Sequence, residues 1–167
     1  MEGDNVNGKS RLALAIAGSF AFFLVGSRAA FAAPPTDACS LLTTAQVSAV
    51  LGVTAETGKP LAPTITKVCH WGASGTAGKG SAKKGVMLTL QDPRAFAYAK
   101  MPVGNGITKV DVSGVGDDAV YGTTPGFPTV LTVKKGDVVF VVHVNGFTDD
   151  EIKAKEKTLA LDVLARL

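Results

Sequence analysis

The sequence predicts a two-layer α+β domain in which helices pack on one face of an antiparallel sheet, in the order α-β-β-α-β-β-β-β-α. Helix-start signals stand near residue 43 and again near residue 148. Between them, short stretches of alternating polarity are separated by turn residues, as is typical of antiparallel strands. The chain that follows a leader is long enough for one domain with a real core. We therefore expect a single domain over 38–167, preceded by a flexible lead-in at 33–37.

Residues 1–32 have the three parts of a secretory signal peptide. Lys9 and Arg11 supply positive charge, an apolar run covers 12–25, and Ala30-Phe31-Ala32 forms an A-x-A cleavage signature. At about 1.5 Å per residue the run reaches roughly 21 Å, short of the roughly 30 Å of a bilayer core. We expect a cleaved leader, an exported protein (periplasmic or extracellular) and no stable membrane span after cleavage. The alternative is an uncleaved segment that anchors the chain.

The chain contains two cysteines, Cys39 and Cys69. In an exported protein such a pair usually forms one disulfide, which here would close a loop of about 30 residues. The adjacent His70 suggests a Cys-His nucleophile instead. On a strand, however, neighbouring side chains point to opposite faces, so Cys69 and His70 could not form a hydrogen-bonded dyad. We expect a disulfide and no catalytic cysteine.

The first helix has a complete start signal. Thr43 is a good N-cap and Gln46, three residues later, completes a capping box. Leu42 and Val47 form the matching hydrophobic staple, and Gly52 is a natural stop. The pattern predicts a helix between Thr43 and Gly52.

A strand is expected over 64–71, with Cys69 and Trp71 on one face. Trp71, the only tryptophan, should pack over the disulfide as part of the core; contact with a ligand is the alternative. The segment 72–85 is rich in glycine and lysine and has no large apolar residue, which predicts a flexible loop. A second strand over 86–90 completes a hairpin with the first.

Three lysines of this loop, Lys79, Lys83 and Lys84, are candidates for contact with an anionic wall polymer, lipid head groups or an acidic partner. The alternative is a solvated hairpin tip. The loop departs from the phosphate-binding pattern G-x-x-x-x-G-K-[ST] at two fixed positions, so we expect no bound nucleotide.

Asp92-Pro93 predicts the start of a short helix that reaches about Lys100 and buries Phe96. Lys135-Gly136 predicts a tight turn between the last two strands. The strands of this part are expected over 107–112, 119–121, 129–134 and 138–144.

The final helix repeats the start device of the first. Thr148 caps it, Glu151 closes the capping box, and Phe147 can staple to Ile152. Three acidic residues in its first turn complement the helix dipole.

Motifs with strong catalytic or metal-binding meaning are not found in the sequence: G-x-S-x-G, HExxH and a calcium loop are all absent. The two histidines, His70 and His143, fall on separate strands with no Cys or His at ligand spacing, so we expect no metal site and no cofactor. The net charge of +3 lacks the basic bias of nucleic-acid binders, and no nucleic acid partner is expected.

Several motifs carry a resemblance to a known group. Three motifs are involved: Asp37-Ala38-Cys39-Ser40-Leu41-Leu42-Thr43, Cys69-His70-Trp71 and Gly114-Val115-Gly116-Asp117-Asp118-Ala119. The chain resembles small exported bacterial proteins of unknown function that share a D-x-C-x-L-L-T … C-x-W pattern and a G-x-G-D-x-A segment. The resemblance implies an exported α+β domain with one Cys–Cys bridge, and it brings no catalytic residues.

These features favour an exported, non-enzymatic module that binds a ligand or a protein partner in the cell envelope. A structural or interaction protein anchored by an uncleaved N-terminal segment is the second reading, and a hydrolase is the third. The sequence names neither the ligand nor the oligomeric state.

Overall fold

The structure is a computed structural model that describes residues 33–74, 83–102, 104 and 106–167. The described residues belong to one compact unit. The expected signal peptide at 1–32, Lys79 and most of the expected glycine- and lysine-rich loop lie outside the described residues. Within the described part, no helix is both long enough and apolar enough to cross a membrane.

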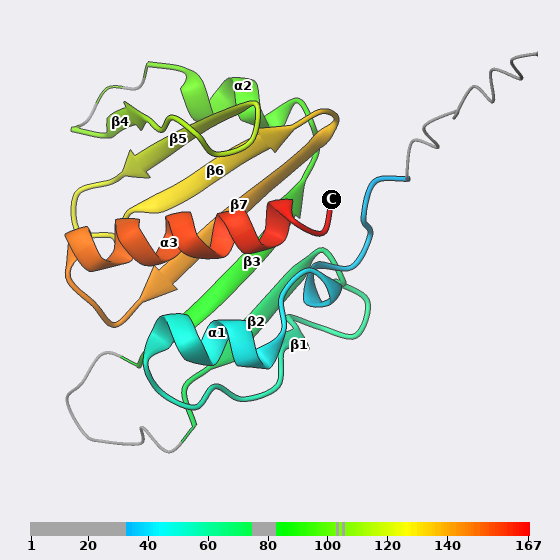
Figure 1. Cartoon of the computed structure of the whole chain (residues 1–167). Coiled ribbons are helices and arrows are strands. Elements are labelled where there is room, and N and C mark those ends of the chain that lie inside the picture. Colours follow the sequence, from blue (N-terminus) through cyan, green and yellow to red (C-terminus); the bar gives the residue numbers. More distant parts are fainter. Residues whose placement is uncertain (1–32, 75–82, 103, 105) are drawn as a thin grey trace, which may run out of the picture. The chain divides into compact units, whose positions relative to one another are not determined.

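A seven-stranded antiparallel sheet forms the centre of the domain, in the order β1-β2-β3-β7-β6-β5-β4 (Figure 1). Six of these strands overlap segments expected from the sequence, but residues 64–67 of the first expected strand lie outside it, because β2 begins at Val68. The two-residue β1, which no pattern indicated, changes the order to α-β-β-β-α-β-β-β-β-α. The strands are β1 (Lys59–Pro60), β2 (Val68–Gly72), β3 (Gly85–Gln91), β4 (Thr108–Asp111), β5 (Asp118–Thr123), β6 (Val130–Lys135) and β7 (Val138–Asn145).

Two hairpin systems meet at the contact between β3 and β7. β2 and β3 pair as the expected hairpin, with Trp71 opposite Val86. β4 to β7 form a meander, and β7 then lies beside β3 with Val86 opposite Val144. This central pairing joins residues far apart in the sequence and makes one continuous sheet.

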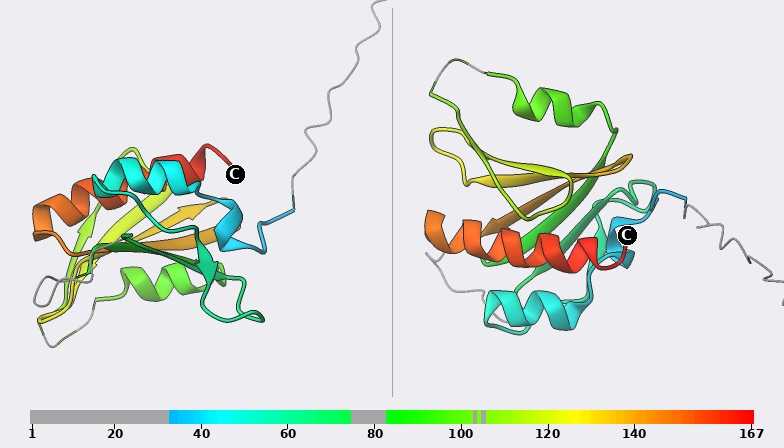
Figure 2. Two further views of the ribbon diagram at one scale, coloured as in Figure 1. Left: turned by 90° about the horizontal axis from the view of Figure 1, so that it is seen from below. Right: turned by 45° about the horizontal axis from the view of Figure 1, so that its top comes forward.

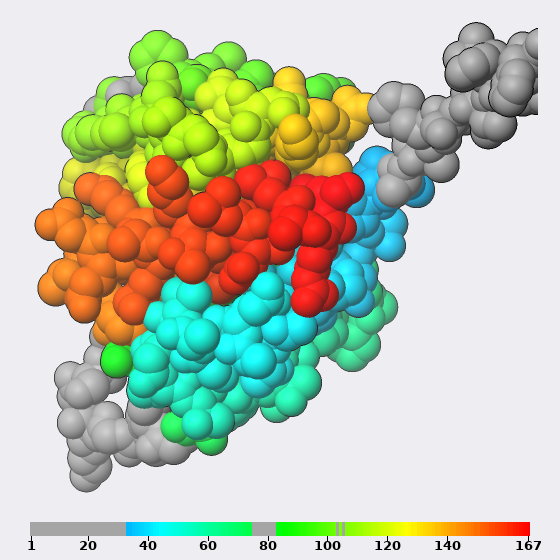
Figure 3. Space-filling model, viewed as in Figure 1, coloured from blue at the N-terminus to red at the C-terminus, as the bar shows by residue number. Residues whose placement is uncertain are grey.

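One face of the sheet carries the main core, under α1 (Thr44–Leu51) and α3 (Asp149–Leu164) (Figures 1 and 2). In the space-filling view, α3 lies across the middle of the molecule, with α1 on one side and β4 and β5 on the other (Figure 3). The largest fully buried side chains include Trp71, Phe140, Leu88, Leu131 and Leu159. Trp71 is 1% exposed, as expected for a core residue.

The short helix α2 (Ala95–Lys100) departs from the expected arrangement, because it packs on the opposite face of the sheet (Figure 2). Its Phe96 is buried, as expected, but against Val120 and Val139, whose side chains point away from the main core. Successive side chains of a strand point to opposite faces of the sheet. A strand that carries apolar side chains on both faces can therefore bury one set under α3 and the other set under α2. The expectation that all helices pack on one face of the sheet is therefore wrong for α2.

Both capping boxes expected from the sequence are present. In α1 the Thr43 hydroxyl accepts the Gln46 N–H at 3.2 Å, and the Gln46 side chain accepts the Thr43 N–H at 2.9 Å. In α3 the Glu151 carboxylate accepts the Thr148 N–H at 3.0 Å. α2 lacks a side-chain cap at Arg94; instead the Asp92 carboxylate accepts the Arg94 N–H at 2.9 Å in the turn before it.

The expected disulfide joins Cys39 to Cys69, with a Cα–Cα distance of 5.0 Å. Cys39 belongs to a 3₁₀ turn, η1 (Ala38–Ser40), and Cys69 lies on β2. A backbone hydrogen bond from the Ala38 N–H to the Thr66 carbonyl, 2.9 Å long, supports the same junction. The bridge therefore fastens the segment before α1 to β2, which lies between β1 and β3 in the sheet.

Candidate functional site

A solvent-open pocket of about 680 Å³ lies at one end of the sheet, between the β5–β6 connection and the β7–α3 connection. Its volume falls in the range of small-molecule sites, which is roughly 300–1,000 Å³. The described lining residues are Gly126, Phe127, Pro128, Asn145, Gly146, Phe147, Thr148, Asp149, Glu151 and Ile152.

The β5–β6 wall is built by a turn with a clear local cause. The Phe127 N–H donates to the Thr124 carbonyl at 2.9 Å, and Gly126 has a φ of 81°. Pro125 followed by Gly126 supplies the fixed φ and the positive φ that the two central positions of a type II turn require. The turn presents Phe127, which is 70% exposed, and leads into the buried Thr129, whose hydroxyl bonds that of Thr123 at 2.8 Å.

The β7–α3 wall is a tight connection held on both sides. Gly146 has a φ of 87°, and a Cβ at this position would lie 2.9 Å from the Lys84 Cα. Only glycine fits both the backbone conformation and the close approach of that neighbouring chain. The connection then passes directly into the Thr148–Glu151 capping box. The hydrogen bonds from Thr148, first the backbone N–H and then the hydroxyl, lower the pKa of the Glu151 carboxyl.

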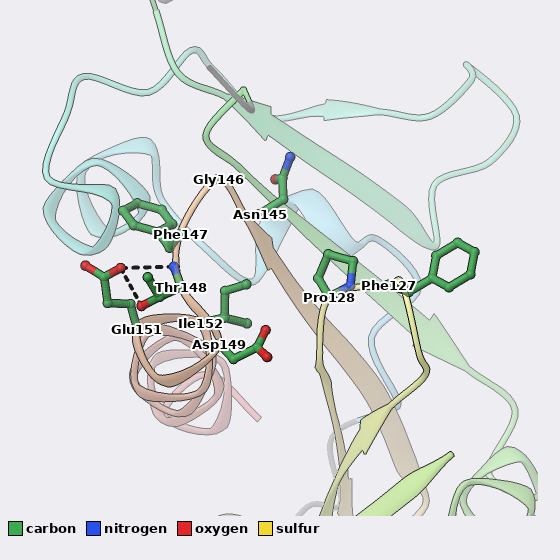
Figure 4. A pocket seen from close by; sticks show the side chains of 10 residues that line it. Phe127, Pro128, Asn145, Gly146, Phe147, Thr148, Asp149, Glu151 and Ile152 are labelled. Atoms are coloured by element: carbon green, nitrogen blue, oxygen red, sulfur yellow. Dashed lines mark hydrogen bonds between the residues drawn. The ribbon is translucent and has the colours of Figure 1, made fainter. Parts of the chain in front are cut away.

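Figure 4 shows which side chains face the space between the two walls. Ile152 and Asp149 extend from the start of α3 on the side nearer Pro128, while Phe147 and Glu151 lie on the other side of the connection. Glu151 is already bonded to Thr148. The Asp149 side chain makes no hydrogen bond or ion pair with any residue that the structure describes, so its carboxylate is available to a ligand.

Two lysines lie over the ring of Phe147 at the rim of the pocket. The Lys84 Nζ is 4.6 Å and the Lys155 Nζ is 4.4 Å from the ring centroid. Both distances are within cation–π range, and Lys155 also donates to the Val50 carbonyl at 2.7 Å. These contacts fix the position of Phe147 and link the pocket rim to α1.

One turn below Ile152, the side chain of Glu156 is fully buried. Its Oε1 accepts the Val144 N–H at 3.1 Å, while its Oε2 has no partner among the described residues. Burial raises the pKa of this carboxyl to about 9, so it is a neutral acid at pH 7. Tyr121 lies nearby and donates its hydroxyl to the Lys153 carbonyl; burial, with a smaller contribution from Glu156, raises its pKa to about 12.

The residues that the sequence singled out lie around this site in different ways. Lys84 contacts Phe147 at the rim. Lys83 contributes its backbone carbonyl, which accepts the Asn145 side-chain N–H at 2.7 Å. Trp71 is buried in the core and does not line the pocket, and Lys79 lies outside the described residues.

Asn145 and Asp149 were not expected as site residues. Pro125-Gly126 does signal a turn, but no local pattern says which other loop that turn meets. Asp149 lies in the first turn of α3, where an acidic side chain is already explained by its favourable interaction with the helix dipole.

The described lining residues offer apolar surface, an amide, a hydroxyl and two carboxylates, but no histidine or cysteine. Among the described residues, no three His, Cys, Asp or Glu side chains gather as metal ligands. These groups can contact a ligand through apolar surface, hydrogen bonds and negative charge. No protein-family model, curated protein or solved structure matches the chain.

Proposed function

We propose that the chain is an exported binding module whose pocket between the β5–β6 and β7–α3 connections holds a small amphipathic ligand. The observation that carries the proposal is the combination of an open pocket of about 680 Å³, the apolar side chains of Pro128 and Ile152, and an unpaired carboxylate at Asp149. A pocket of this kind selects an apolar body together with a group that can meet the carboxylate. We propose an amine, because a protonated amine donates charge-assisted hydrogen bonds to a carboxylate.

Export is the second part of the proposal. It is supported by the leader pattern at 1–32 and by the Cys39–Cys69 disulfide, since disulfides persist mainly in oxidising compartments. The exported form should begin at Ala33 and have the mass of 33–167 less two hydrogens. Intact-mass measurement of protein recovered from outside the cytoplasm tests this part, and a retained leader or two free thiols would contradict it.

The binding part is tested with two matched probes, benzylamine and benzyl alcohol, which share an aromatic body and differ in charge. Amide shifts in ¹⁵N NMR spectra report where each probe binds. We expect benzylamine to shift the amides of Gly126, Gly146 and Ile152 with a Kd of about 1 mM, which corresponds to about −4 kcal/mol. Benzyl alcohol should bind the same place more weakly.

The preference for benzylamine over benzyl alcohol depends on ionic strength. An exposed amine–carboxylate pair is screened by salt, so the preference for the amine should shrink between low and high salt. Equal affinities for the two probes would show that the Asp149 carboxylate does not contribute to ligand recognition. Shifts confined to other parts of the chain would contradict the assignment of the pocket.

A further inference from the structure

The open face of β2, β3 and β7 brings the two histidines of the chain to either side of a methionine. His70 on β2 lies opposite Met87 on β3, and Met87 lies opposite His143 on β7. The three side chains point away from the main core, because their strand neighbours, such as Cys69, Val86 and Val142, are buried in it. Side chains directly opposite in an antiparallel pair have Cβ atoms about 4.5–5.5 Å apart, so two imidazoles flank one thioether.

In the next row across the same strands, two of the three positions are glycines and carry no side chain. Gly72 pairs with Gly85, and Gly85 pairs with Asn145. A Cβ at Gly85 would lie 3.0 Å from the Asn145 Oδ1 and 3.5 Å from the His70 Nε2. These two polar atoms therefore converge over a glycine floor, next to Met87 and His143.

The amide of Asn145 is held with its oxygen toward this floor. Its nitrogen donates to the Lys83 carbonyl at 2.7 Å, so the oxygen is turned to the Gly85 side. The row of side chains thus presents two imidazoles, a thioether and an amide oxygen on one small area of the sheet.

His143 supplies an unexplained polar atom at this place. Its Nε2 is buried and has no hydrogen-bond partner among the described residues. Buried polar atoms are nearly always paired, and an orphaned one calls for a water or an ion. Burial also lowers the pKa of this imidazole, which favours the neutral form that binds metals.

We propose that His70, Met87 and His143 bind one copper(I) ion on the open face of the sheet, with the Asn145 oxygen beside it. Thioether sulfur is a soft donor that selects copper(I), and imidazole binds copper as well. Zinc sites use cysteine, histidine and carboxylate ligands, so a methionine at the centre of the row favours copper over zinc. The exposed His70 gives the ion access from solvent.

This inference does not rest on the proposed function of the pocket. The two sites share only Asn145, and the test uses residues that do not line the pocket. It also differs from the expectation of no metal site, because the sequence alone does not show that His70 and His143 lie two strands apart.

The test is an anaerobic copper(I) titration of the purified, disulfide-intact protein against a competing chromogenic chelator. We expect one equivalent of copper(I) per chain. Met87→Leu keeps the size and apolar character of the side chain, so the fold should persist. Its copper(I) affinity should fall at least about tenfold, the loss that even an outer-shell partner causes. His143→Gln and His70→Gln should lower the affinity at least as much.

Met101→Leu is the matched control, because Met101 is exposed and lies outside the row. It should bind copper(I) like the native protein. X-ray absorption of the copper-loaded protein should show sulfur in the coordination sphere, and Met87→Leu should remove it. Absence of stoichiometric binding, or equal affinity in Met87→Leu and Met101→Leu, would overturn the site. Zinc binding as tight as copper(I) and insensitive to Met87→Leu would overturn the choice of metal.

Discussion

The Glu156 carboxyl on α3 accepts a hydrogen bond from the Val144 N–H on β7, 3.1 Å away, in the interior of the domain. Val144 faces Val86 on β3, so this bond ties the long helix to the centre of the sheet. Glu156 is fully buried and its second oxygen has no partner in the described part of the chain. Burial therefore keeps the group protonated, with a pKa raised to about 9.

A raised carboxyl pKa makes the folded state sensitive to alkaline pH. In the unfolded chain the group has a pKa near 4.5, whereas the folded domain holds the proton until about pH 9. Its contribution to stability is complete below pH 4.5 and is lost as pH rises between these values. One extra bound proton in the native state corresponds to a loss of about 1.4 kcal/mol per pH unit.

Glu156→Gln should abolish this loss, because the amide does not titrate. Urea unfolding at pH 5, 6.5 and 8 measures the difference between the variant and the native protein. That difference should shift in favour of Glu156→Gln by up to about 1.4 kcal/mol per pH unit. A difference that is constant across this range would show that the carboxyl is not held protonated.

The disulfide should account for much of the stability of the domain. Cys39 and Cys69 are 30 residues apart, and closing such a loop stabilises the folded state by about 3–4 kcal/mol. The Cys39→Ala/Cys69→Ala double variant should lose about this much in urea unfolding. An unchanged unfolding midpoint would mean that the bridge does not constrain the unfolded chain.

Gly58 lies against the indole of Trp71, and a Cβ there would clash with the ring. Gly58→Ala should therefore destabilise the domain by about 1–3 kcal/mol, the usual cost of overpacking. Because Trp71 is the only tryptophan, its fluorescence should change as well. Gly104→Ala is the control, since no atom of the described residues lies within 4 Å of a Cβ at that glycine. Equal stability and fluorescence in the two variants would contradict the packing.

Thr43 caps α1 through its hydroxyl, which accepts the Gln46 N–H. Thr43→Ala should lower the free energy of unfolding by about 1 kcal/mol. Thr44→Ala, at the next position, removes a hydroxyl of the same size from inside the helix and should have a smaller effect. Thermal unfolding by circular dichroism compares the two, and a larger effect at Thr44 would count against the cap.

Local features of the fold could be read from the sequence because their causes lie within a few residues. Both capping boxes depend on side chains three positions apart, at Thr43 and Gln46 and at Thr148 and Glu151. The alternation of β2 likewise places Cys69 and Trp71 in the core and His70 outside. The disulfide follows from having two cysteines and no others.

Features that depend on contacts between residues far apart in the sequence could not be predicted in this way. The position of α2 depends on which face of β5 and β7 remains uncovered, and Phe96 alone does not show this. The pocket joins the turn at Gly126 to the connection at Gly146, and no pattern in either segment points to the other. The strand β1 is too short, at two residues, to leave a periodic signal.

The measurement that tests the central claim most directly is the benzylamine affinity of native protein, Asp149→Asn and Asp150→Asn compared side by side. Both aspartates lie in the first turn of α3, but only Asp149 lines the pocket. Asp149→Asn should weaken binding about fivefold at low salt, which corresponds to about 1 kcal/mol, the upper range for an exposed ion pair. Asp150→Asn should bind like the native protein. Equal affinities in all three proteins, or a larger loss in Asp150→Asn, would contradict a binding pocket at this end of the sheet.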